Sequence, residues 1–119
     1  MNVNEFRDFC LSLKGVRENA PWSEPQYQNL ITFTVGGKWF SLLDIENKFT
    51  NLKCNPNMIL ELQDKYSGCF PAWHMNKTHW IGVRLESDVS DDEIKEMIRA
   101  AYRLIVNSLT SKVREELRL

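Results

Sequence analysis

Residues 31–42 read ITFTVGGKWFSL, and this stretch decides the architecture. Apolar and polar residues alternate on both sides of Gly36-Gly37, which is the pattern of two antiparallel strands joined by a two-residue turn. The expected pairs are Val35–Lys38, Thr34–Trp39, Phe33–Phe40, Thr32–Ser41 and Ile31–Leu42. Directly opposed residues share a face. One face would therefore carry Ile31, Phe33, Phe40 and Leu42, and the other Thr32, Thr34, Trp39 and Ser41.

Helix signals surround this hairpin. Asn2 and Glu5 have capping-box spacing ahead of an apolar stripe that stops at Gly15, and Ser90 and Glu93 repeat that spacing before the longest stripe in the chain. Asn55-Pro56 begins a further helix that ends before Gly68, and Thr110 begins a short one through Leu117. Further strands are expected at Phe49–Cys54 and Trp80–Leu85, with a short edge strand or loop over Val16–Pro25. The pattern predicts one α+β domain over residues 1–119, with an antiparallel sheet and helices packed on one face.

Composition narrows the function classes. The chain has 119 residues and a net charge of −1, so strong sequence-independent binding to nucleic acid is not indicated by charge alone. Charge is uneven, however, because six acidic residues and one basic residue lie between Glu86 and Glu96. No stretch approaches the ~20 apolar residues of a membrane span, and the first residues do not resemble a signal peptide, so we expect a cytoplasmic protein. The three cysteines have no disulfide or zinc spacing.

Alternation also predicts a functional face. If the strands form one sheet, the face without helices carries Trp39 and Trp80 beside Lys53, Arg84 and Asn51, together with the hydroxyls of the hairpin. Flat aromatic groups among cations and amides suit stacking on nucleic-acid bases or docking of a protein partner. The alternative is that one or both tryptophans are covered by the C-terminal helix or the proline-rich segment and serve as core.

The densest group of chemically active residues is the segment 73–80, WHMNKTHW. A turn at Asn76-Lys77 would bring His74 and His79 face to face, where two imidazoles could bind a metal or exchange protons. No third ligand is evident nearby, and the histidines can equally fix the loop through backbone hydrogen bonds. No phosphate-binding glycine loop occurs, and no cysteine or serine has a recognisable catalytic partner. We therefore expect no catalytic residues, no cofactor and no resident metal.

Several segments together resemble one family across nearly the whole chain. They are GGKWF at 36–40, NLKCNP at 51–56, HMNKTHW at 74–80, the helix from Asp92 to Val106 with Tyr102, and KVREEL at 112–117. In this order they are similar to the MmcQ/YjbR family. The resemblance implies a CyaY/frataxin-like α+β sandwich with a double-wing arrangement and a DNA-binding role. It would assign phosphate contacts to Lys38, Lys53, Lys77 and Arg84, and base or sugar contacts to Trp39 and Trp80.

The first hypothesis is a non-catalytic DNA-binding module that uses this face and the wing loop. The alternative is a protein-interaction module on the same face, and a third is a metal protein or enzyme centred on His74 and His79. The oligomeric state and the form of DNA stay open. The candidate binding residues are Lys38, Trp39, Asn51, Lys53, His74, Asn76, Lys77, His79, Trp80 and Arg84.

Overall fold

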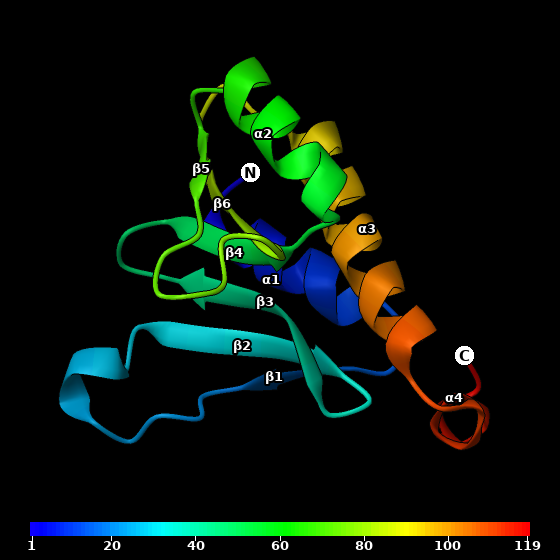
Figure 1. The fold of residues 1–119 in the computed structure, drawn as a ribbon. Helices are drawn as coiled ribbons and strands as arrows, with labels where there is room; N and C mark the ends of the chain where they lie inside the picture. The colour runs from blue at the N-terminus through cyan, green and yellow to red at the C-terminus, as the bar shows by residue number, and fades with distance from the viewer.

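The computed structural model describes residues 1–119 as a six-stranded antiparallel sheet with helices packed on one face. The strand order is β1-β2-β3-β4-β6-β5 (Figure 1). This α+β arrangement confirms the predicted fold class. In chain order the elements are α1 (Val3–Ser12), β1 (Val16–Asn19), the 3-10 helix η1 (Pro25–Tyr27), β2 (Leu30–Val35), β3 (Lys38–Asp44), β4 (Phe49–Lys53), α2 (Pro56–Lys65), β5 (Cys69–Pro71), β6 (Trp80–Arg84), α3 (Asp91–Ser108) and α4 (Ser111–Leu117).

The hydrophobic core lies between the sheet and helices α1, α2 and α3, which share one side of it (Figure 1). Helix α3 crosses β2, β3 and β4, while α1 packs near β1 and α2 near β5 and β6. Phe6, Phe33, Phe40 and Ile98 are fully buried there. None of the helices has the combination of length and apolar character that crossing a membrane requires.

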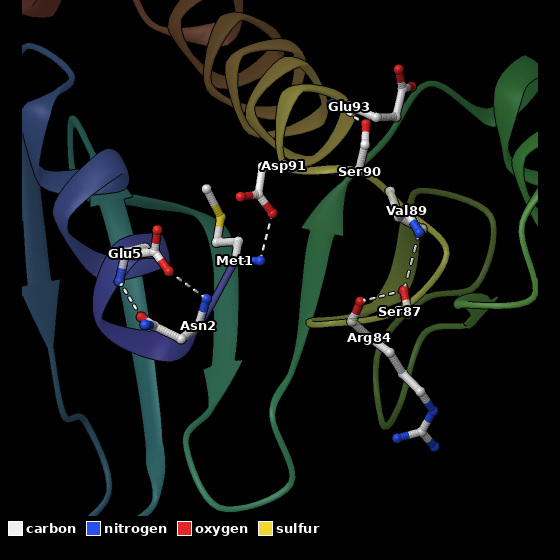
Figure 2. Close-up of polar contacts among 9 residues, drawn as sticks. All are labelled: Met1, Asn2, Glu5, Arg84, Ser87, Val89, Ser90, Asp91 and Glu93. Atoms are coloured by element: carbon white, nitrogen blue, oxygen red, sulfur yellow. Dashed lines mark hydrogen bonds and ion pairs between the residues drawn. The ribbon is translucent and has the colours of Figure 1, made fainter.

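The helices begin where their capping residues predict. The Asn2 side chain accepts a hydrogen bond from the Glu5 N–H, and the Glu5 carboxylate accepts one from the Asn2 N–H, which completes a capping box (Figure 2). Ser90 caps α3 by accepting from the Glu93 N–H, and the Met1 amine pairs with Asp91 at the same helix start (Figure 2). These local bonds account for the accuracy of the predicted helix starts, since each satisfies backbone donors that a helix leaves free.

The Gly36-Gly37 turn forms as predicted, with positive φ values of 59° and 78°. Val35 pairs with Lys38 and Thr34 with Trp39, but a β-bulge follows, and the next pairs are Phe33–Ser41, Thr32–Leu42 and Ile31–Leu43. The expected pairs beyond Trp39 were therefore wrong, because the bulge adds one residue to β3.

The bulge changes the core. Phe40 stays buried under the helices, but Leu43 takes the core position expected for Leu42, and Leu42 lies on the opposite face. Ser41 is on the helix-covered face, where its hydroxyl bonds to that of Thr50 at 2.9 Å, so its placement among the open-face hydroxyls was also wrong. A single added residue exchanges the faces of all that follow it.

Candidate functional site: the helix-free face of the sheet

The face of the sheet opposite α1–α3, here called the helix-free face, has accessible cations and a buried carboxylate on its strands. Strand alternation directs Arg17, Lys53 and Arg84 to this face, and none of the three forms an ion pair. The carboxylate on the same face, Asp44, is 3% exposed and accepts hydrogen bonds from Asn29 and Asn47. The accessible charges of these strands are therefore all positive, although the whole chain carries −1.

Two loops return over the helix-free face. Residues 20–29, which include η1, and residues 72–79 both lie on the side of the sheet away from the helices (Figure 1). Between them is a hollow of about 330 Å³, here called the aromatic pocket. Leu30 and Leu42, both nearly fully buried, belong to its β2–β3 side. The full lining is Trp22, Tyr27, Leu30, Trp39, Leu42, Trp73, His74 and Met75.

Contacts between aromatic rings, most of them edge-to-face, hold the walls of this pocket. Trp22 contacts Trp39 with ring centroids 5.5 Å apart and Tyr27 at 6.2 Å. On the other side Trp73 packs against Phe49 at 6.1 Å and against His74 at 4.2 Å. Such pairs add stability beyond their buried area and restrict ring motion.

Asn51 is the residue that fixes the second wall. Its side-chain amide donates to the Trp73 carbonyl at 2.7 Å and accepts from the Trp73 N–H at 3.3 Å. Asn51 lies on the predicted face but is completely buried, so the expectation that its amide is uncovered was wrong. The 72–79 loop covers it, and its amide positions Trp73 instead of facing solvent.

The two tryptophans singled out from the sequence are both half-buried. Trp39 lies beside Trp22. Trp80 is the first residue of β6 and lies under Lys53, whose Nζ is 5.5 Å from the centre of the Trp80 ring. Lys53 and Trp80 are directly opposed in the β4–β6 register. Arg84 lies over the Phe70 ring at 5.4 Å on the same face. The predicted cation–aromatic combination therefore exists, in separate groups along the face.

The segment after Trp73 forms a turn held by Asn76. Its side chain accepts from the Thr78 N–H at 2.8 Å, and its carbonyl accepts from the His79 N–H. Lys77 is exposed at this turn. His74 packs against Trp73 with φ of 54°, and His79 is exposed. No three histidine, cysteine or acidic side chains lie close enough together to hold a metal ion.

Lys38 is separated from the other candidates. It pairs with Val35 on the helix-covered side of the turn, and its Nζ lies 3.5 Å from the Ser108 carbonyl at the end of α3. A cation near helix C-terminal carbonyls is favourable, which gives Lys38 a structural use. Only a ligand that extended around the hairpin turn would reach it.

A second hollow, the polar pocket, adjoins the aromatic pocket and shares Trp39 with it. Its volume is about 600 Å³, and Arg17 is its one charged residue. Asn19 donates to the Thr34 hydroxyl at 3.1 Å within it. Arg17 was not predicted from the sequence, because a four-residue strand followed by proline does not reveal which side chain faces the sheet surface.

Trp22, Tyr27, Trp73 and Met75 were also missed as site residues. They lie in loops, where no periodicity indicates orientation, and they reach the site only because both loops fold back over the sheet. Three of the four tryptophans of the chain line this one pocket. The number of tryptophans in the chain was therefore the one sequence signal that could have drawn attention to these residues.

The helix-covered side offers a contrast. A groove of about 400 Å³ between α2 and α3 is lined mainly by apolar residues, with Glu93 and Glu96 among the polar ones. Arg103 lines it too but is paired with Glu96 at 3.0 Å. Lys53, at the end of β4, also lines this groove, so two cations and two carboxylates balance there, unlike the strand charges of the helix-free face.

The cysteines do not form a reactive site. Burial raises the pKa of the Cys54 thiol and raises that of Cys69 to about 11, and it raises the pKa of Cys10 further. A thiol with a raised pKa stays protonated and is a poor nucleophile. All three are free.

Comparisons with known proteins identify relatives along most of the chain. The YjbR family model matches residues 11–104. The chain is 34% identical over 89 residues to the uncharacterized protein YbdF of Escherichia coli O157:H7, covering 72% of each chain. It is 26% identical over 119 residues to the uncharacterized protein YjbR of Escherichia coli K12, covering 97% of this chain and 96% of that one.

Solved structures share the fold as well. The crystal structure of a Deinococcus radiodurans protein with a DUF419 domain superposes with a TM-score of 0.88 at 28% identity, covering 99% of this chain and 88% of that one. A crystal structure from Pseudomonas syringae gives a TM-score of 0.74 at 28% identity, covering 87% and 98%. Because the family model matches most of this chain, the chain belongs to the YjbR family.

Proposed function

We propose that this protein is a non-catalytic DNA-binding module that uses the helix-free face. The observation that carries the proposal is the composition of that face: its accessible strand charges are the unpaired cations Arg17, Lys53 and Arg84, and they flank an aromatic pocket. Cations that are free of carboxylate partners can neutralise phosphates, and exposed rings can stack on bases.

The distribution of acidic residues supports the same proposal. Asp91, Asp92, Glu93 and Glu96 lie on α3, in the helix layer, so the acidic cluster does not repel a polyanion at the opposite face. Lys77, on the 72–79 loop, adds a further accessible cation near the aromatic pocket. Glu24, on the 20–29 loop, is an exposed carboxylate on this side, but the four cations outnumber it, so local charge favours DNA on a protein whose net charge does not.

The test is a fluorescence-anisotropy titration with mixed-sequence single- and double-stranded DNA at two ionic strengths. The proposal predicts binding that weakens steeply with added salt and that falls in Lys53→Ala and Arg84→Ala. Lys65→Ala is the matched control, because it removes the same charge from α2 in the helix layer. Absent binding at low salt, or binding that salt does not affect, would reject the proposal.

A protein-interaction module is the second candidate, favoured by the pocket lining, in which seven of eight residues are hydrophobic. A partner that inserted an apolar side chain would bind with little dependence on salt. Trp73→Ala would then abolish partner binding, while Arg17→Ala and Arg84→Ala would leave it nearly unchanged. The two candidates are thus separated by which class of substitution matters.

A further inference from the structure

The aromatic pocket has the features of a preformed site for one flat group. Its volume of about 330 Å³ lies in the range of small-ligand sites. Trp22 and Tyr27 come from one loop and Trp73 and Met75 from the other, so a ring that entered would lie between two separately anchored walls. The Asn51 amide holds one wall and the Trp22–Trp39 contact holds the other. A site that is already ordered loses little entropy on binding.

Charge decides which flat group fits. No carboxylate lines the aromatic pocket or the adjoining polar pocket, so a cationic ligand would find aromatic faces but no counter-charge. Arg17, unpaired, lines the polar pocket, and Trp39 belongs to both hollows. The combined surface therefore offers aromatic contacts on one side of Trp39 and a free guanidinium on the other.

A nucleotide has the matching chemistry. Its base is a flat, uncharged ring that stacks on aromatic side chains, and its phosphate is an anion that a guanidinium can bind through two parallel hydrogen bonds. In a duplex both faces of each base are covered by neighbouring bases, and only the edges can be reached in the grooves. An aromatic pocket can take a base only when that base is unstacked.

We infer that the aromatic pocket binds one unstacked base of single-stranded DNA, with the adjoining phosphate at Arg17 in the polar pocket. This inference rests on the proposed DNA-binding function and specifies the form of DNA. Trp73 and Tyr27, with 39% and 38% of their surfaces exposed, are the tryptophan and tyrosine side chains of the lining that are most open to a base. Met75 contributes to the same wall.

The experiment compares three oligonucleotides of about 12 nucleotides, each labelled for anisotropy: oligothymidylate, its duplex with oligoadenylate, and an abasic strand with the same phosphates. Oligothymidylate is expected to bind at least about 10-fold more tightly than the other two, since only it offers free bases. Intrinsic tryptophan fluorescence, measured in Trp80→Phe to remove the tryptophan outside the pocket, should be quenched by oligothymidylate and unchanged by the abasic strand.

Variants localise the effect. Trp73→Ala is expected to weaken oligothymidylate binding about 5- to 100-fold and to leave abasic-strand binding unchanged. Met75→Glu places a carboxylate in the pocket and should have a similar effect, whereas Leu60→Glu adds the same charge at an exposed apolar position on α2, in the helix layer, and should have little. Thermal unfolding shows whether each variant is folded. If Trp73→Ala is unfolded, the result for Met75→Glu decides whether the pocket binds the base.

The outcomes separate the two proposals. If the duplex or the abasic strand binds as tightly as oligothymidylate, and the pocket variants bind like the unaltered protein, the base-binding inference is wrong while DNA binding by the face stands. If none of the three binds at low salt, the proposed function is wrong and the inference with it. If the variants lose oligothymidylate binding selectively, both are supported.

Discussion

Asn51 and Trp73, 22 positions apart in the chain, are joined by two hydrogen bonds, with the Asn51 amide donating to the Trp73 carbonyl and accepting from the Trp73 N–H. Asn51 is on a central strand and completely buried, and Trp73 is on a loop and partly exposed. The pair transmits the rigidity of the sheet to a wall of the aromatic pocket.

Asn51→Ala should therefore loosen the loop. It leaves the Trp73 N–H and carbonyl without their partners, which should lower the free energy of unfolding by about 1–3 kcal/mol. Affinity for oligothymidylate should fall because the wall is no longer preformed. Urea unfolding and anisotropy measure the two effects. Asn107→Ala, at an exposed position on α3, is the control, and equal behaviour of the two variants would show that the pair does not order the loop.

Arg17→Ala should reduce the salt dependence of DNA binding. Removing one phosphate contact lowers the slope of log K against log salt by about 1 and weakens binding of all sequences alike. Anisotropy titrations at several salt concentrations give the slope, with Lys65→Ala as the charge-matched control. An unchanged slope in Arg17→Ala would place the phosphate elsewhere on the face.

Gly82→Ala should displace the Phe70 ring on the helix-free face and lower the stability of the protein. A Cβ at Gly82 would overlap the Phe70 ring, which lies directly opposite it in the β5–β6 register. The ring must move, and with it the Arg84 and Phe49 contacts, at a cost of about 1–3 kcal/mol. Thermal or urea unfolding measures this cost. In Gly37→Ala, the comparison, a Cβ would meet nothing, so only the strain of a positive φ, about 1–2 kcal/mol, is expected there.

The buried thiols should make the protein less stable at alkaline pH. Burial raises the pKa of Cys10, and raises that of Cys69 to about 11, whereas unfolded thiols ionise near pH 8.5. Between about pH 8.5 and 11 the unfolded chain thus binds fewer protons than the folded one, and each thiol lowers the free energy of unfolding by about 1.4 kcal/mol per pH unit. Urea unfolding across this range should show the decline, and Cys10→Ala should make it shallower. A Cys10→Ala slope equal to that of the unaltered protein would contradict this.

Asp88 should contribute stability that is lost in acid. Its carboxylate accepts hydrogen bonds from the Ser67 and Gly68 N–H groups, at 2.8 and 2.7 Å, and these bonds hold its pKa below the ordinary value. The contribution is complete above the unfolded pKa of about 3.9 and disappears as the pH falls through the lower folded value. Asp88→Asn should therefore show a smaller loss of stability on acidification, as measured by urea unfolding. An identical acid profile would mean that the two bonds persist without the charge.

The accuracy of prediction from sequence depended on how local each signal was. The helix caps at Asn2, Asn55 and Ser90 involve residues two or three positions apart, and the Gly36-Gly37 turn involves adjacent ones, so their physics is contained in the local sequence. The bulge at Phe40 was not predictable from alternation. It inserts one residue into β3 that has no partner on β2, whereas alternation assumes that every residue has one.

The candidate site likewise has features that the local sequence predicted and features that only the folded chain produced. Alternation by itself directed Lys53, Trp80 and Arg84 to one face of the sheet, because successive side chains of a strand point to opposite sides whatever surrounds them. Whether that face is open or covered was settled only by the folded chain. The returns of residues 20–29 and 72–79 buried Asn51 and gathered Trp22, Trp39 and Trp73 around one pocket, through contacts between segments that are far apart in sequence and leave no periodic trace in it.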